Sequence, residues 1–192
     1  MAEQYLSAFA VDADRFRGMP GSGDEALVRA AVAAVGAPDL LRATDPVEVE
    51  AALREVVAGR LDPARPGGYT WLLELLGATA GTPVGGLVLP GRGWHALHKA
   101  MRSWGLPTLA GAWKRPFPWP AELDDPWPFP MLVPDTVREE LASFDPEEIY
   151  DDDRWEDDAE ELVDLLGKSL PAWLTAAHTR GHALLVVRDG GR

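Results

Sequence analysis

The chain has 192 residues, with 18 Lys plus Arg, 31 Asp plus Glu, no cysteine and a formal net charge of −13. A hydrophobic fraction of 46% with 26% charged residues is typical of a globular domain and excludes a wholly disordered chain. The lack of cysteine excludes a disulfide scaffold, an iron–sulfur site and a thiolate zinc site. The negative charge argues against nonspecific binding of nucleic acid or an anionic membrane.

The N-terminal ten residues contain no basic residue and no long apolar run. A secretory signal needs both, and a membrane helix needs about 20 apolar residues. We therefore expect a soluble cytoplasmic protein that does not engage membranes. Arginine is strongly preferred to lysine, and Ala, Gly and Pro are frequent, which is typical of a GC-rich bacterial genome.

Hydrophobic periodicity and capping residues predict a chain that is mostly helical. The clearest helix follows Asp45, an N-cap residue with Pro46 behind it in the first helical position, and ends at Gly59. Ser169 is a second expected cap, at the start of the last helix. In chain order we expect a strand at 5–11, helices at 24–35, 46–58 and 69–79, a strand at 84–89, helices at 94–104, 136–144, around 162–166 and from 170 to 180, and a strand at 183–187.

Residues 107–134 form a stretch rich in proline and aromatic residues, with eight of the 17 prolines. Proline cannot continue a helix and pushes the preceding residue into an extended conformation. We therefore expect a stiff extended connection that seals the core. Two other interpretations are a ligand for a proline-binding module and a segment that lines a pocket. If the stretch seals the core, we expect four of its aromatic side chains to be mostly buried: Phe117, Trp119, Trp127 and Phe129.

The two clearest strands lie at opposite ends of the chain, and an isolated pair of strands is only marginally stable in water. We therefore expect both strands to take part in one small sheet that is covered by helices. No repeat at a solenoid period is present. The predicted fold is a single α+β domain over residues 1–192, mostly helical.

Charge is distributed unevenly along the chain. Residues 122–164, the acidic segment, hold 18 acidic against two basic residues, a net charge of −16, whereas residues 75–121 hold no acidic residue. Such a segment is usually a solvated helix start, favoured by the helix dipole. The alternative is a surface that steers and anchors a basic partner. The candidate partner-binding residues are Asp151, Asp152, Asp153, Trp155, Asp157 and Asp158.

Basic and aromatic side chains alternate over residues 92–119. That combination holds nucleotides and single strands, yet no RNA-binding or phosphate-loop motif is present, so we expect no nucleic-acid partner. The open alternatives are an aromatic core whose bases face the acidic segment, and a pocket for a small molecule or anion. The candidate ligand-binding residues are Arg92, Trp94, His95, His98, Arg102 and Trp119.

The four histidines form two pairs at helical spacing, His95 with His98 and His178 with His182. No HExxH glutamate accompanies them, and Gly181 interrupts the second pair, so we predict no metal site and no cofactor. The sequence also lacks a GxSxG motif and a histidine placed to activate a serine. It therefore indicates no catalytic residues.

The opening YLSAFAVDADRFRGMPGSGDEALVRAA resembles the start of an uncharacterised bacterial family of small single-domain proteins, in which a strand ending in Val-Asp precedes a GSGDE turn and a helix. The late WLTAAHTRGHALLVV is similar to the closing helix, glycine and strand of that family. The resemblance covers about the first 30 and last 20 residues. It implies a fold unit, and no activity or site residue comes with it.

Two function classes follow. The first is a noncatalytic protein-interaction module, an accessory, immunity-like or antitoxin-like protein, that captures a basic protein partner through the acidic segment. The second is a small-molecule or anion-binding protein or enzyme with a Trp/His/Arg-lined pocket around residues 92–119. The absence of a catalytic constellation favours the first class.

Overall fold

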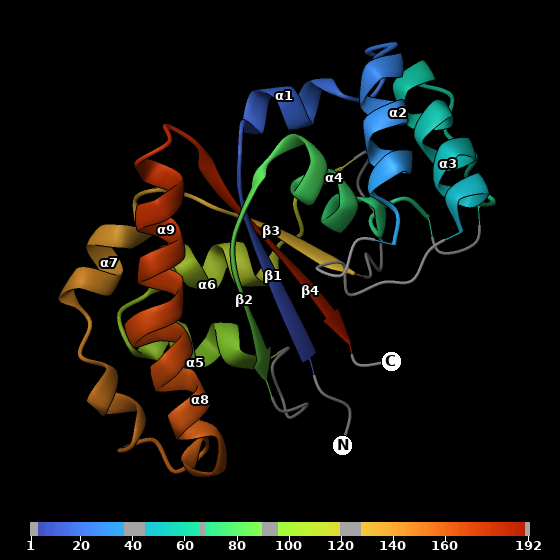
Figure 1. The fold of residues 1–192 in the computed structure, drawn as a ribbon. Helices are drawn as coiled ribbons and strands as arrows, with labels where there is room; N and C mark the ends of the chain where they lie inside the picture. The colour runs from blue at the N-terminus through green and yellow to red at the C-terminus, as the bar shows by residue number, and fades with distance from the viewer. Residues whose placement is uncertain (1–3, 37–44, 66–67, 90–95, 120–127, 191–192) are drawn as a thin grey trace.

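A computed structural model describes residues 4–36, 45–65, 68–89, 96–119 and 128–190. Its four strands form one antiparallel sheet in the order β2-β1-β4-β3 (Figure 1). The strands are β1 (Gln4–Val11), β2 (Thr82–Leu89), β3 (Phe129–Val133) and β4 (Ala183–Gly190). The first and last strands therefore pair at the centre of the sheet, and the predicted α+β domain with both terminal strands in one sheet is confirmed.

Helices cover both faces of this sheet. They are α1 (Ala13–Gly18), α2 (Glu25–Ala34), α3 (Pro46–Ala58), α4 (Leu72–Ala80), α5 (Leu97–Ser103), α6 (Pro107–Lys114), α7 (Val137–Ser143), α8 (Ala159–Asp164) and α9 (Leu170–His178). Short 3-10 turns, η2 (Pro146–Ile149) and η3 (Glu156–Asp158), and the π-helical turn η4 (Leu165–Ser169) join some of them. None of the described helices is long and apolar enough to cross a membrane.

The predicted caps of α3 are confirmed. The Asp45 carboxylate accepts a hydrogen bond of 2.9 Å from the backbone N–H of Val47, and Pro46 occupies the first helical position. Gly59 ends the helix with a φ of 64°, in the left-handed region that glycine adopts without strain. Local chemistry therefore sets both ends of this helix.

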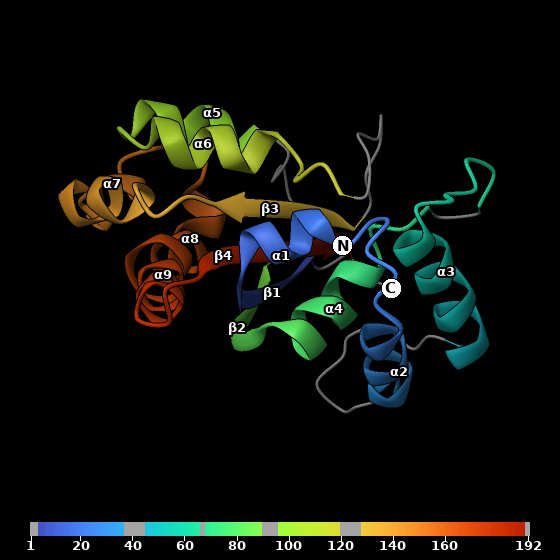
Figure 2. The same cartoon turned by 90° about the horizontal axis from the view of Figure 1, so that it is seen from above.

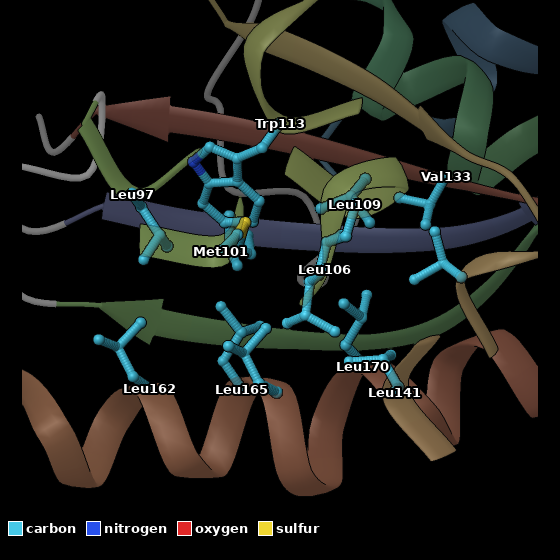
Figure 3. Packing of buried hydrophobic residues seen from close by; sticks show 14 of the residues in the cluster. Leu97, Met101, Leu106, Leu109, Trp113, Val133, Leu141, Leu162, Leu165 and Leu170 are labelled. Carbon is cyan, nitrogen blue, oxygen red and sulfur yellow. The ribbon is translucent and has the colours of Figure 1, made fainter. Parts of the chain in front are cut away.

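Alternate residues of β1 face two separate apolar cores. Leu6 and Ala8 belong to the first core, with α5 to α9, whereas Phe9 and Val11 belong to the second core, with α1 to α4. Figure 2 shows α2 to α4 and α7 to α9 at opposite sides of the molecule. Figure 3 shows the first core from nearby, where leucines of α8, η4 and α9 point toward β2 and toward side chains of α5 and α6.

The proline-rich stretch contains more regular structure than expected. Residues 107–114 form α6 and residues 129–133 form β3. Pro107 opens α6, where no backbone N–H is needed, and Pro130 lies in an outer strand, which tolerates a missing donor. Phe117 and Trp119 are buried, as expected for a segment that seals a core, and Phe129 is half-buried. Trp127 lies outside the described residues.

The expectation that Ser169 caps a new helix is wrong. Ser169 has helical φ and ψ of −66° and −54°. Its hydroxyl donates to the Asp164 carboxylate at 3.2 Å and accepts no capping hydrogen bond from a backbone N–H of α9. The π-helical turn η4 joins α8 to α9 without a break, because its backbone stays helical throughout. One rod therefore runs from residue 159 to residue 178.

The contact between α9 and β2 leaves no room for a side chain at Gly85. A Cβ atom built at Gly85 would lie 1.9 Å from the indole Nε1 of Trp173. We expect Gly85→Ala to lower the free energy of unfolding by about 1–3 kcal/mol, because the methyl group displaces Trp173 from the first core. Urea unfolding followed by Trp fluorescence measures the change.

Gly111→Ala in α6 is the matched control, because a Cβ built there has no neighbour within 4 Å. We expect this substitution to raise stability by about 0.5–1 kcal/mol, the gain of alanine over glycine inside a helix. A Gly85→Ala protein as stable as wild type would contradict the described packing of Trp173.

Candidate functional site

A cavity of about 430 Å³ lies between α5 and the turn that leads into α8. One wall comes from residues 75–121, which contain no acidic residue, and the other comes from the acidic segment. We call it the acidic pocket; its lining residues are Ala96, Lys99, Ala100, Asp153, Arg154, Trp155, Glu156, Asp157 and Asp158. Two segments that are more than 50 residues apart in the sequence therefore share one concave surface.

Aromatic packing holds the two walls of the acidic pocket together. Trp104, which follows α5, meets Trp155 edge to face, with ring centroids 6.5 Å apart and an interplanar angle of 62°. Trp104 also stacks on Phe144, at 6.3 Å. Trp155 is only 7% exposed. Burial of these large rings fixes the acidic turn against α5.

The turn itself is held by Asp152. Its carboxylate accepts hydrogen bonds from Nε and Nη2 of Arg154, at 2.7 and 2.6 Å, and from the Arg154 backbone N–H, at 3.2 Å. The hydrogen bonds from Arg154 hold the pKa of Asp152 below its ordinary value. The Arg154 guanidinium is thus engaged by a residue outside the pocket lining.

Backbone hydrogen bonds carry the turn into η3. The N–H of Trp155 donates to the carbonyl of Asp152 at 2.8 Å, and the N–H of Asp158 donates to the carbonyl of Trp155 at 2.9 Å. Acidic residues fill the first turns of η3 and α8, where the helix dipole favours negative charge. Part of the acidic segment therefore stabilises its own helix start.

The acidic pocket carries four carboxylates, from Asp153 and residues 156–158, against the two cations Lys99 and Arg154. Lys99 is exposed. Among the described residues, no ion pair within 4.0 Å joins Lys99 or Arg102 to the acidic segment. The basic and acidic segments therefore share one lining, in which carboxylates outnumber cations.

The candidate partner-binding residues gather at this pocket. Asp153, Trp155, Asp157 and Asp158 line it, Asp152 shapes the turn, and Asp151 lies exposed beside it. The residues by which α5 lines the pocket, Ala96, Lys99 and Ala100, are not among the residues predicted from the sequence. The spacing of Ala96, Lys99 and Ala100 on one helical face was the available signal.

The candidate ligand-binding residues lie apart. Arg92, Trp94 and His95 lie outside the described residues. On α5, His98 is half-buried and Arg102 is exposed, and neither lines the acidic pocket. Trp119 is 1% exposed in the second core, where its indole N–H donates to the Phe16 carbonyl at 2.8 Å. Its visible role is to hold α1 in place.

Of the remaining histidines, His178 contacts Asp135 through Nδ1 at 3.1 Å, at the end of α9. Within the described ranges, no group of three or more His, Asp or Glu side chains is arranged to hold a metal ion. The arrangement instead suits recognition of a cation, because carboxylates surround a surface that contains an indole ring.

Comparison with known proteins places the chain in a family. A family model described as a domain of unknown function (DUF7691) matches residues 2–188. The match spans the middle of the chain as well as both ends, and so runs from β1 into β4. No curated protein and no solved structure matches the chain.

The hydrogen bonds of Asp152 generate a pH-dependent prediction. We expect Asp152→Asn to lower stability by about 1 kcal/mol at neutral pH, because the neutral side chain loses charge-assisted hydrogen bonds with Arg154. The folded pKa of Asp152 lies below its ordinary value of 3.8. Its contribution is therefore present above that value and is lost as the pH falls through the folded pKa.

Urea unfolding at neutral and acidic pH measures this effect. The curves of wild type and variant should converge at the acidic end. Asp151→Asn is the matched control, because this exposed neighbour makes no ion pair within the described part of the chain. Equal losses in the two variants would show that Asp152 acts only through net charge.

Proposed function

Because the chain belongs to the DUF7691 family, a family of domains of unknown function, we propose its function from the acidic pocket alone. The protein is a noncatalytic interaction module that captures a basic protein partner. An accessory, immunity-like or antitoxin-like role is the class of function that such a surface serves. The observation that carries the proposal is the cavity of about 430 Å³ with carboxylates around Trp155.

The shape of the site supports binding over simple solvation. A solvated helix start needs no concavity, whereas here α5 supplies a second wall. A long basic side chain entering the cavity meets Asp153 and Glu156, both exposed, and can pack its stem against the edge of Trp155. The pocket thus offers the two parts of an interface anchor, a charged contact and an apolar surface.

The surroundings of the pocket support capture at a distance. Many residues of the acidic segment are exposed on the described surface: Glu139, Asp145, Glu147, Glu148, Asp151, Asp153, Glu156, Asp157 and Glu160. Clustered charge of one sign raises the association rate of an oppositely charged partner, and salt screens that attraction. The module would therefore bind its partner quickly at low salt.

A second candidate is a site for a small molecule or anion in the 92–119 stretch. One observation favours it: α5 forms a wall of the cavity, and Lys99 places an ammonium group there. The exposed carboxylates of Asp153 and Glu156 in the same lining repel an anion. A rise in melting temperature with inorganic phosphate, and no binding of a basic peptide, would favour this second candidate.

Calorimetric titration with a short peptide of alternating lysine and alanine tests the proposal. We expect binding that weakens as salt is added, and a loss of about tenfold or more in affinity for the double variant Asp153→Asn/Glu156→Gln, because both pocket carboxylates are neutralised.

The matched control is Glu147→Gln/Glu148→Gln, which changes the net charge equally on exposed residues outside the pocket lining. We expect a loss below about threefold for the control, from weaker long-range attraction. Equal losses in the two double variants would reject the pocket as the binding site. Absence of peptide binding at low salt would reject the proposed function.

A further inference from the structure

The two outer strands of the sheet, β3 and β2, differ in whether another segment forms hydrogen bonds with their outer edge. The backbone N–H of Phe117 donates to the carbonyl of Pro130 at 2.8 Å, so the chain after α6 contacts β3 at this residue. Pro130 also removes one donor from that edge. By contrast, β2 lies at the front of the sheet in Figure 1, and no described strand pairs with its outer side.

The open edge also lacks the usual protection. Outer strands of natural proteins carry lysine or other charges that prevent pairing with another strand. Residues 82–89 contain no charged residue. Pro83 blocks pairing only near the start of β2, so the run from Gly85 to Leu89 keeps all its backbone N–H groups. Val88 is 48% exposed in this run.

A groove of about 550 Å³ follows the same strand on the side that faces α4. Its lining is mostly apolar and consists of Tyr5, Leu6, Ser7, Phe9, Ala78, Pro83, Gly85, Gly86, Leu87 and Val88. Gly86 lies beside Ser7 of β1, and Val88 lies beside Tyr5. Because Gly86 has no side chain, the groove is open next to the exposed Val88.

We propose that β2 pairs with β2 of a second copy of this chain, antiparallel and around a twofold axis at Leu87. Backbone groups along an open edge are satisfied by a strand. Pairing at Leu87 sets Val88 of each copy opposite Gly86 of the other, so that each exposed valine enters the other's groove. In a twofold dimer, each residue near the axis lies close to the same residue of the other copy. Because residues 82–89 carry no charge, this self-pairing brings no like charges together.

Sedimentation equilibrium from micromolar to near-millimolar protein tests this dimer. We expect wild type to pass from monomer to dimer over that range. Val88→Lys should weaken the dimer by about tenfold or more, because two lysines then enter the apolar contact and lose the valine packing. Val47→Lys is the matched control: Val47 is 74% exposed on α3, away from β2, and its substitution should leave the dimer unchanged.

Hydrogen exchange locates the contact independently of any substitution effect on folding. Backbone amides within 85–89 should exchange more slowly at high than at low protein concentration in wild type, and at one rate in Val88→Lys. A wild type that stays monomeric throughout would overturn the proposal. A dimer that Val88→Lys and Val47→Lys affect equally, or one without protection of 85–89, would also overturn it.

Discussion

The pairing of β1 with β4, the first strand with the last, buries apolar side chains on both faces of the sheet. Two buried faces require two layers of helices, because neither face tolerates water. The chain meets this requirement in order: α1 to α4 cover one face, and α5 to α9 cover the other before β4 closes the sheet. The pairing of β1 with β4 therefore holds the two ends of the chain together and forms a boundary between the two cores.

This arrangement determines where the acidic pocket forms. Trp173 of α9 packs over Gly85 of β2, which fixes the rod formed by α8, η4 and α9 against the sheet. The rod begins at the acidic turn, and α5 packs in the same core. The two walls of the pocket therefore meet because both belong to the first core. The rings of Trp104 and Trp155 are in direct contact between the walls.

One basic side chain, Arg188, is buried in the protein, whereas most of the described acidic segment lies at the surface. Arg188 of β4 is buried at 6% exposure, and its guanidinium lies 4.7 Å from the ring centroid of Phe129 and 5.4 Å from that of Trp113. Burial lowers the pKa of Arg188 to about 10. The acidic segment has the opposite fate, since most of its described carboxylates lie at the surface. The protein therefore buries one cation in its first core and keeps much of its negative charge at the surface.

The sequence by itself determined the features that depend on neighbouring residues: the cap and stop of α3, the terminal strands, the α+β class and the uneven charge. Three features depended on distant residues. Ser169 continues a helix because the rod packs as a unit, Trp119 turns to Phe16 in the second core, and Lys99 meets the acidic turn across the first core. Local patterns report backbone preference and periodicity, whereas side-chain partners are chosen by packing between segments far apart in the chain.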